Sequence, residues 1–565
     1  MIHGNLTGLK TSQIKALERI YRRRVPPGQV VSGELARYLT ELSEELRRQL
    51  GLIIDRGGLV KYVVVGDDRE IVIPDLSDFA LGRSGLRRLR CVHTHLQHEP
   101  LSPDDLTDLA LLRLDLMLAI EVGEGGLPGP VHYAHILPAN RAGKSVEVLR
   151  APSVYDLDLD LTVFLRALEG ELEQKMAETH DLSDAREKAI LISVSQEPRR
   201  ETDDSLDELA ELARTADVLV LDRFIQRPRR INPKYLMGEG KAREVVISAL
   251  QQGATLLIFD QDLSPGQVRS IAALTDLKVI DRSQLILDIF ARRAHTRDGK
   301  VQVELAQLKY ILPRLTGRGV ALSRLMGGIG GRGPGETQLE IDRRRIRDRI
   351  SRLERELQSL SRGRLQRRNR RVKAGVPIIS IVGYTNAGKS TLLNALTRSH
   401  VLTEDLLFAT LDTATRRLRF PQEREVIITD TVGFIRKLPP SLLGAFKATL
   451  EEMEDADLLL HLVDAGNPRF EEQIAAVERI LLELGLEGIP RLLVLNKIDL
   501  LPAAEGAALC RRFGALPVSA LDRKSFEPLM KAMEERCWPD ADAHAIEARN
   551  ETEPDSESDE PFAGE

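Results

Sequence analysis

An apolar segment of the chain runs directly into a glycine-rich loop that ends in a lysine and a serine. Within IISIVGYTNAGKSTLLNAL, Gly383, Gly388, Lys389 and Ser390 have the spacing G-x-x-x-x-G-K-S. Glycines at these positions let backbone N–H groups close around phosphate oxygens, and the following helix would present its positive N-terminus to them. Lys389 would neutralise the β- and γ-phosphates, and the Ser390 hydroxyl would bind Mg²⁺. The motif therefore predicts a nucleoside triphosphate site.

Two further loops would complete the phosphate and metal contacts. REVIITDTVGF puts Asp430 at the end of an apolar strand, where it would hold Mg²⁺ through water, and the Gly433 amide would contact the γ-phosphate. A threonine of LLFATLDTATR should close over the metal. Thr410 is the predicted residue, with Thr413 and Thr415 as substitutes. The predicted catalytic residues are thus Lys389, Thr410, Asp430 and Gly433, and the predicted metal ligands are Ser390 and Thr410.

The identity of the base is predicted by RLLVLNKIDL, in which Asn496, Lys497 and Asp499 follow a buried strand. A carboxylate that accepts two N–H bonds from guanine N1 and N2 has no comparable partner on adenine, so ATP is rejected. LPVSAL adds Ser519 and Ala520 as backbone contacts to guanine O6. The spacing, order and strand context of these loops predict a GTPase.

The predicted nucleotide site extends to the neighbours of these residues. It comprises Gly383, Tyr384, Thr385, Asn386, Ala387, Gly388, Lys389, Ser390, Thr391, Phe408, Ala409, Thr410, Leu411, Asp412, Asp430, Thr431, Val432, Gly433, Asn496, Lys497, Ile498, Asp499, Ser519, Ala520 and Leu521. Asn386 is at the position of a K⁺ ligand in cation-dependent GTPases, although it could simply brace the loop. Phe434 stands where many GTPases have a water-orienting glutamine. Intrinsic hydrolysis should therefore be slow, about 10⁻⁴ to 10⁻³ s⁻¹, until a partner completes the site.

Length and composition set the wider frame. The chain has 565 residues, with 42% hydrophobic and 29% charged residues and a net charge of −6. It is too long for one core, and roughly three to five domains are expected. Three widely spaced cysteines exclude a disulfide framework. The N-terminus lacks a signal peptide and no apolar run reaches the ~20 residues of a membrane span, so a cytoplasmic protein is predicted.

The pattern of apolar runs divides the chain into four blocks and a tail. Residues 1–190 alternate strand-like runs (KYVVVGDD, REIVIP, RLRCVHTH) with helical stretches, which predicts an N-terminal α/β extension. Residues 191–283 show βαβ spacing and uniformly apolar strands, which predicts a small parallel α/β domain. Residues 374–540 form the nucleotide domain. Residues 541–565 hold nine acidic groups and one arginine, which predicts an acidic disordered tail.

Residues 284–373 are predicted to form a helical linker hairpin. One long helix, possibly interrupted near 296–300, is joined by a glycine-rich loop to a second. From Ile341 to Lys373 there are 14 arginines and lysines against 4 acidic residues. One interpretation is a solvated, salt-bridged helix, because Glu354 and Glu356 lie among the arginines. The run after Leu360 has almost no acidic partners, which favours binding to a nucleic-acid backbone.

Several segments together resemble the HflX family of ribosome-associated GTPases. They are YLMGEGKAREV, IFDQDLSPGQVRSI, VIDRSQLILDIFARRAHT, KVQVELAQLKYILPRL, GGIGGRGPGETQLEIDRRRIRDRI, LLFATLDTATRRL and DTVGFIRKLPPSLLGAFKATLEE, and they span about residues 190–470. The resemblance implies a multidomain α/β protein whose P-loop GTPase domain has a mainly parallel sheet with helices on both faces. It also implies binding to the 50S subunit and 23S rRNA, splitting of 70S ribosomes, and a role in stress or rescue.

The hairpin loop would, by the same resemblance, reach toward the peptidyl transferase centre, with Arg318, Arg324 and Arg332 as candidate RNA contacts. The protein is expected to act as a monomer. ATP binding by the N-terminal part, implied for some family members, stays open because no P-loop motif occurs there. A GTP-dependent scaffold or signalling switch with a protein partner is an alternative function.

A separate pattern lies in CVHTHLQHEPLSPDDLTDL. His93 and His95 are at i and i+2 of a strand and would point to one face, as a metal-binding pair would, with Ser102 and Asp105 following. The pattern resembles the HxH…SxxD signature of JAMM-type zinc peptidases, although its spacer is one residue shorter. The catalytic glutamate is unassigned, and Glu70 is a guess. The alternative is two histidines at a strand end beside a helix N-cap serine. A bifunctional protein with a JAMM-like metal site is thus a further alternative.

Overall fold

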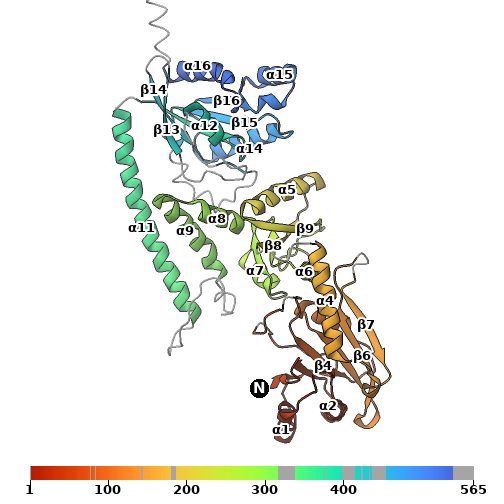
Figure 1. Ribbon diagram of the computed structural model, residues 1–565. Coiled ribbons are helices and arrows are strands. Elements are labelled where there is room, and N and C mark those ends of the chain that lie inside the picture. Colours follow the sequence, from red (N-terminus) through yellow and green to blue (C-terminus); the bar gives the residue numbers. More distant parts are fainter. Residues whose placement is uncertain are drawn as a thin grey trace, which may run out of the picture. The chain divides into compact units, whose positions relative to one another are not determined.

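The structure is a computed structural model of the whole chain, and its elements are drawn in Figure 1. It describes residues 2–76, 78–82, 84–140, 144–179, 186–315, 338–373, 376–397, 414–420, 424–431, 433–435 and 453–538. The chain divides into two compact units, Met1–Arg282 and Ser283–Glu565. None of the helices in these ranges combines the length and apolar character that a membrane crossing requires.

The first unit begins with a mixed seven-stranded sheet of order β1-β3-β2-β4-β5-β6-β7. Its strands are β1 (Ile2–Gly4), β2 (Leu50–Asp55), β3 (Val60–Val65), β4 (Leu89–His95), β5 (Leu116–Val122), β6 (Pro128–Ile136) and β7 (Val146–Ala151). The accompanying helices are α1 (Thr11–Arg19), α2 (Gly33–Leu46), α3 (Pro103–Leu112) and α4 (Leu161–Thr179). β4 and β5 are parallel, so the loops after both strands leave the same edge of the sheet.

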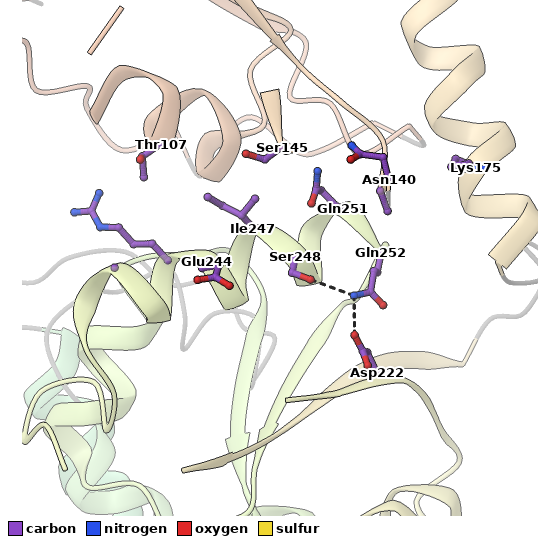
Figure 2. A pocket seen from close by; sticks show the side chains of 13 residues that line it. Thr107, Asn140, Ser145, Lys175, Asp222, Glu244, Ile247, Ser248, Gln251 and Gln252 are labelled. Atoms are coloured by element: carbon purple, nitrogen blue, oxygen red, sulfur yellow. Dashed lines mark hydrogen bonds between the residues drawn. The ribbon is translucent and has the colours of Figure 1, made fainter. Parts of the chain in front are cut away.

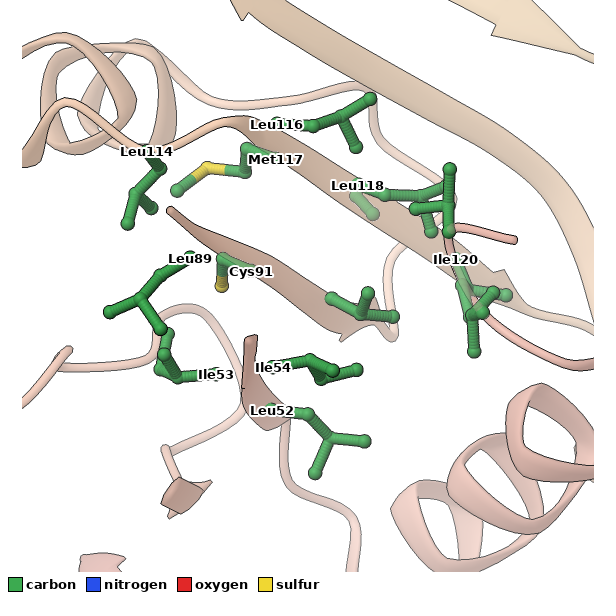
Figure 3. Packing of buried hydrophobic residues seen from close by; sticks show 14 of the residues in the cluster. Leu52, Ile53, Ile54, Leu89, Cys91, Leu114, Leu116, Met117, Leu118 and Ile120 are labelled. Atoms are coloured by element: carbon green, nitrogen blue, oxygen red, sulfur yellow. The ribbon is translucent and has the colours of Figure 1, made fainter. Parts of the chain in front are cut away.

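The centre of this sheet is buried, which holds β4 rigidly in place. Figure 3 shows side chains of β2, β4 and β5 packed together, among them Leu52, Cys91 and Leu118. α2 adds Leu35 and Leu39 to the same core. Because protein interiors are close-packed, side chains on β4 have little freedom to move.

One predicted strand in this part is wrong. KYVVVGDD and RLRCVHTH supply β3 and β4, but REIVIP, residues 69–74, forms no strand. β3 already has β1 on one side and β2 on the other, so no ladder position next to it is free. The Asp67 carboxylate accepts hydrogen bonds from the N–H groups of Arg69 and Glu70, which stabilises a turn. The isoleucines of REIVIP serve instead as packing residues against the core.

The second sheet is parallel throughout, as predicted, with the order β11-β10-β8-β9. Its strands are β8 (Glu187–Val194), β9 (Val218–Gln226), β10 (Leu256–Phe259) and β11 (Lys278–Asp281). The helices are α5 (Arg199–Thr215), α6 (Glu239–Gln251) and α7 (Pro265–Ala272). α7 was not predicted. Its start is encoded by a capping box, in which Ser264 and Gln267 satisfy each other's backbone N–H groups, and by Pro265 in the first turn.

Helix α8 (Arg282–Arg293) starts at the last residue of the first unit, and α9 (Arg297–Ile311) and α11 (Gln338–Lys373) follow in the second unit. The interruption predicted near 296–300 is found at residues 294–296, because the Thr296 hydroxyl caps α9 by accepting from the Gly299 N–H. α9 and α11 pack through Val301, Leu305 and Leu353. Arg349 of α11 forms an ion pair with Glu304 of α9, and Arg297 of α9 with Glu356 of α11.

These ion pairs support the salt-bridged interpretation for the first half of α11. Glu356 pairs across to α9 rather than with an arginine of its own helix. The side chains of the arginine run in residues 361–373 lie outside the description, as do Arg318, Arg324 and Arg332 and the acidic tail. The predicted RNA contacts of these residues therefore stay predictions.

The nucleotide domain contains a six-stranded sheet of order β13-β14-β12-β15-β16-β17. Its strands are β12 (Ile378–Gly383), β13 (Ala414–Arg419), β14 (Glu425–Asp430), β15 (Leu458–Asp464), β16 (Arg491–Asn496) and β17 (Leu516–Pro517). Its helices are α12 (Lys389–Thr397), α14 (Phe470–Glu483), α15 (Ala503–Phe513) and α16 (Phe526–Cys537). Only β13 is antiparallel among these strands. Alternate residues of β16 enter two different cores, so helices cover both faces. The predicted fold class is confirmed.

Candidate nucleotide-binding site

The loop between β12 and α12 has the backbone that its glycines were predicted to allow. Gly388 has φ +90°, a conformation that residues with a side chain rarely adopt. A Cβ atom at Gly388 would lie 2.4 Å from Nδ2 of Asn496. The loop thus packs tightly against the end of β16, and glycine is required at this position.

Lys389 is buried at the start of α12 and turns back over the loop. Its Nζ donates hydrogen bonds to the carbonyl oxygens of Gly383, at 3.2 Å, and Tyr384, at 2.8 Å. Burial lowers the pKa of Lys389 to about 8, and the nearby Asp430 carboxylate only partly offsets this. A buried ammonium group with so little compensation would be stabilised by an anion, as phosphate is.

Ser390 and Asp430 bring two oxygen ligands together beside Lys389. The Ser390 Oγ donates to Oδ2 of Asp430 at 2.5 Å, and Asp430 is fully buried at the end of β14. Hydroxyl and carboxylate oxygens are ligands that Mg²⁺ prefers. The Thr385 hydroxyl is buried in the loop without a hydrogen-bond partner among the residues that the structure describes. The site therefore fits a magnesium ion with a phosphate group.

Phe434 has a structural role that the sequence did not indicate. Its ring is buried, and its N–H donates to the carbonyl of Gly383 while its own carbonyl accepts from the Thr385 N–H. The loop after β14 is therefore fastened to the phosphate loop by backbone hydrogen bonds. Because the ring is buried and apolar, it cannot orient a water molecule, and slow intrinsic hydrolysis stays a prediction.

Asn496 joins three loops on the base side of the site. Its Nδ2 donates to the carbonyl of Ala387 at 2.8 Å, and its Oδ1 accepts from the Ala520 N–H at 3.0 Å. Lys497 has a left-handed backbone, and its Nζ pairs with Asp464 at 2.8 Å. Asp499 follows in an exposed turn and is open to a ligand. Asp464 was missed, although an acidic residue ending the apolar strand LLLHLVD was a usable signal.

The remaining predicted residues divide into two groups. Thr391 lies in the first turn of α12, Ile498 in the turn with Asp499, and Leu521 is 84% exposed. The Ser519 N–H donates to Ser525 Oγ rather than pointing into an open pocket. The other group lies outside the described residues and consists of Phe408, Ala409, Thr410, Leu411, Asp412, Thr413 and Val432. The substitute Thr415 is paired with Thr429 in the β13–β14 ladder.

Replacing Gly388 by alanine is expected to weaken guanine nucleotide binding by roughly 10- to 100-fold, because the methyl group strains the backbone and displaces the Asn496 amide. A titration with a fluorescent GDP analogue measures the effect. Gly485→Ala is the matched control, since Gly485 also has a positive φ of +72° but no atom within 4 Å of its Cβ position. If both variants bind the nucleotide as the unmodified chain does, the close approach of Asn496 has no functional role.

The first unit contains a cavity of about 630 Å³ between α6 and the first sheet domain. Figure 2 shows Ile247 and Gln251 of α6 on the side of the helix toward Ser145 and Asn140, and Glu244 and Lys175 also line the cavity. Arg243 and Asp222 also line it. Because cations and carboxylates both contribute, the charge of the lining favours neither an anionic nor a cationic ligand.

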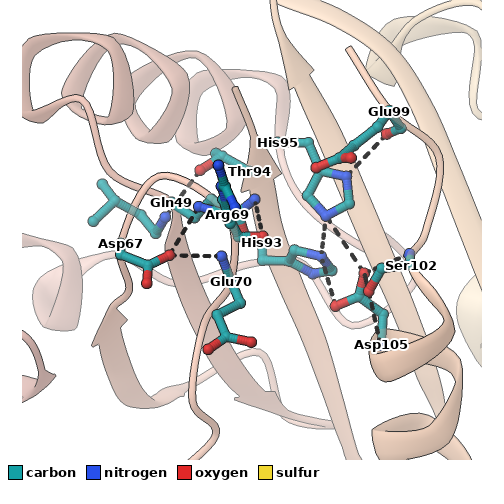
Figure 4. Close-up of polar contacts among 11 residues, drawn as sticks. Gln49, Asp67, Arg69, Glu70, His93, Thr94, His95, Glu99, Ser102 and Asp105 are labelled. Carbon is teal, nitrogen blue, oxygen red and sulfur yellow. Dashed lines mark hydrogen bonds and ion pairs between the residues drawn. The ribbon is translucent and has the colours of Figure 1, made fainter. Parts of the chain in front are cut away.

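His93 and His95 lie on β4 and Asp105 lies in the first turn of α3, so the structure brings these three predicted residues together. Ser102 is the N-cap of α3, as the alternative interpretation predicted. Glu70, the guess for the catalytic glutamate, is not one of the three clustered residues, and Figure 4 shows its carboxylate directed away from the two imidazoles, so its role stays a guess.

Comparison with known proteins finds three family models that match successive parts of the chain. A model described as GTP-binding GTPase N-terminal matches residues 203–291, and one described as GTP-binding GTPase Middle Region matches residues 293–371. A model described as 50S ribosome-binding GTPase matches residues 378–497. The third match contains the Lys389, Asp430 and Asn496 loops.

Two similar proteins are both described as GTPase HflX. The chain is 51% identical over 321 residues to GTPase HflX of Caldanaerobacter subterraneus subsp. tengcongensis, covering 57% of this chain and 74% of that protein. It is 48% identical over 321 residues to GTPase HflX of Escherichia coli strain K12, covering 57% and 75%. A crystal structure of a GTP-binding protein from Sulfolobus solfataricus with GDP is 26% identical, covers 62% of this chain and 98% of that one, and has a TM-score of 0.35.

Proposed function

Because the chain belongs to the GTPase HflX family and is a GTP hydrolase, we propose that it cleaves GTP to GDP and phosphate while bound to the large (50S) ribosomal subunit. The observation that carries the proposal is the convergence of Lys389, the Ser390–Asp430 pair and Asn496 at the carboxyl ends of neighbouring parallel strands. Ligands of open α/β sheets bind at this edge.

Each residue has a proposed task. Lys389 binds the β- and γ-phosphates, and the amide of Gly433 contacts the γ-phosphate. Ser390, Thr410 and Asp430 would hold Mg²⁺. The ion supplies charge neutralisation for the phosphates. Asn386 is proposed as a K⁺ ligand. Its backbone is left-handed, with φ +61°, which is compatible with a phosphate loop that curves around the nucleotide. Asp499 reads the guanine base, with Lys497 held in place by Asp464.

The hairpin is the proposed contact with ribosomal RNA. α11 has exposed arginines beyond those paired with α9, among them Arg347 and Arg352. The arginine run of residues 361–373 and the loop residues Arg318, Arg324 and Arg332 would add to a contact with 23S rRNA phosphates. We further propose that the protein splits 70S ribosomes under stress and acts as a monomer in the cytoplasm. Its chain would consist of four domains and a tail.

GTP hydrolysis is expected to rise by about 10²-fold or more when 50S subunits are added, because the buried Phe434 ring cannot orient the attacking water and the partner would supply the orienting group. The measurement is phosphate release from GTP with and without purified 50S subunits. Equal turnover in both conditions would contradict the proposed partner.

Co-sedimentation with 50S subunits tests the RNA contact separately. Binding should require a non-hydrolysable GTP analogue rather than GDP and should weaken steeply with salt. Replacing both Arg347 and Arg352 by glutamate should weaken it further, whereas Arg479→Glu, on the exposed face of α14, should not. Binding that is indifferent to nucleotide and salt would favour the scaffold alternative instead.

A further inference from the structure

Three ligand-type side chains converge in the N-terminal domain, in the unit that does not contain the GTP site. Figure 4 shows His93 and His95 side by side on β4, with Asp105 of α3 facing both rings. The two Nε2 atoms are 2.9 Å apart, the His93 Nε2 is 3.4 Å from Oδ1 of Asp105, and the His95 Nε2 is 3.5 Å from Oδ2. Both histidines are buried. Two imidazole nitrogens and a carboxylate thus point at one small volume, and such a set of ligand atoms can bind a metal ion.

The two nitrogen–oxygen distances fit a metal site better than direct hydrogen bonds, whereas the 2.9 Å between the two nitrogens is also a hydrogen-bond length. In a tetrahedral zinc site with bonds of about 2.0–2.2 Å, neighbouring ligand atoms lie about 3.3–3.6 Å apart. The two nitrogen–oxygen separations are of this size but involve the two different oxygens of Asp105, so the carboxylate would turn to present one oxygen to the ion, and the nitrogen–nitrogen separation would open by a few tenths of an ångström. The same nitrogen–oxygen separations are long for hydrogen bonds.

The surroundings hold the ligand atoms in the form that a metal needs. The Nδ1–H of His95 donates to the Glu99 carbonyl at 2.9 Å, which leaves the Nε2 lone pair free for a metal. Oδ2 of Asp105 accepts from the Ser102 hydroxyl and the Ser102 N–H, both at 2.8 Å, which fixes the carboxylate. The N-cap interpretation and the metal-site interpretation are therefore compatible, because Ser102 both caps α3 and orients Asp105.

We propose that His93, His95 and Asp105 bind one Zn²⁺ ion, with the fourth tetrahedral position open to water or to a small ligand. Mixed imidazole and carboxylate ligands suit zinc, whereas Mg²⁺ and Ca²⁺ prefer oxygen ligands alone. Among the residues described in the structure, the cluster has three such ligands rather than the four of a closed structural site. Cys91 precedes His93 on the same strand but belongs to the hydrophobic core.

The test is the zinc content and zinc affinity of the full-length protein, purified without chelator and with any affinity tag removed. Mass spectrometry of the metal should find about one zinc per chain, and competition with a chromophoric chelator gives the affinity. His95→Ala and Asp105→Ala should lose the ion. Ser102→Ala should bind it about 10- to 100-fold more weakly, because it removes one of the two hydrogen bonds that orient Asp105. His98→Ala, whose side chain is 62% exposed, is the matched control and should keep the zinc.

Cobalt substitution supplies a readout that does not depend on zinc retention. Co²⁺ in the unmodified chain should show the intense visible bands of four-coordinate geometry, and these should vanish in His93→Gln. Circular dichroism and thermal unfolding establish that the variants are folded, and an unchanged GTP hydrolysis rate shows that the second unit is unaffected. The proposal is overturned if the unmodified chain neither contains zinc nor binds added Zn²⁺ or Co²⁺, or if the His93 and His95 variants bind it equally well. The three side chains would then be held together by hydrogen bonds at the N-terminus of α3 and would bind no metal.

Discussion

Replacing Lys389 by alanine is expected to lower the rate of GTP hydrolysis by about 10²- to 10³-fold, because it removes the ammonium group that we propose neutralises the transferring phosphate. In the structure this ammonium group is held by the carbonyls of Gly383 and Tyr384, which fix its position before any ligand arrives. Such pre-positioned charge costs no reorganisation during the reaction, so its loss falls on the transition state. Single-turnover phosphate release at saturating GTP measures the effect.

The Lys389→Ala variant should remain folded. Burial lowers the pKa of Lys389, so the charged side chain is unfavourable in the folded protein and its removal should cost little stability. Thermal unfolding of the variant checks this. The matched control is Lys531→Ala, because Lys531 is 78% exposed on α16 and its ion pair with Glu535 is a surface pair of small value. If Lys389→Ala hydrolysed GTP within a few-fold of the control, the proposed role of the lysine would be wrong.

The GTP site could be predicted from the sequence because its chemistry depends on residue types at fixed spacing next to strands. Gly388, Lys389 and Asp430 each follow an apolar run, and the carboxyl ends of parallel strands meet at one edge. The histidine pair was predictable for the same local reason, since residues two apart on a strand share a face. The residues of both sites could therefore be predicted from short sequence motifs.

Contacts between loops that are distant in the chain could not be predicted in this way. No local pattern indicates that the Asn496 side chain bonds both Ala387 and Ala520, or that the backbone of Phe434 is paired with the phosphate loop. The strand prediction for REIVIP was wrong for a related reason. Its apolar pattern suits a strand, but β3 already pairs with β1 and β2. Pairing is a property of the whole sheet, whereas alternation of residues is local.

The helical hairpin shows a third limit. The sequence of α11 contains a large surplus of positive charge, yet acidic partners on another helix reduce it locally, as Glu304 does for Arg349. A count along one helix could not reveal this pairing. The arginines free to contact phosphates are those left after such pairs are removed, which is why the co-sedimentation variants use Arg347 and Arg352.

Replacing Asp499 by asparagine is expected to transfer the base preference from guanine to xanthine. The carboxylate would accept hydrogen bonds from guanine N1–H and from the C2 amino group, whereas the asparagine amide would donate to the C2 carbonyl oxygen of xanthine. Hydrogen bonds to charged groups are worth about 1.5–3 kcal/mol each, so kcat/KM for GTP should fall by about 10²- to 10⁴-fold. Xanthosine triphosphate should improve by a comparable factor. Steady-state hydrolysis of the two nucleotides measures the ratio.

The geometry makes this a specific test rather than a test of folding. Asp499 is exposed in its turn, while the residues that hold the turn, Lys497 with Asp464 and Asn496 with its two loops, are unchanged. Glu505→Gln, an equal change of an exposed carboxylate at the start of α15, should leave the preference for GTP intact. ATP should remain a poor substrate for both variants, because neither an aspartate nor an asparagine finds a C2 substituent on adenine. An unaltered ratio of GTP to xanthosine triphosphate in Asp499→Asn would mean that the base is read elsewhere.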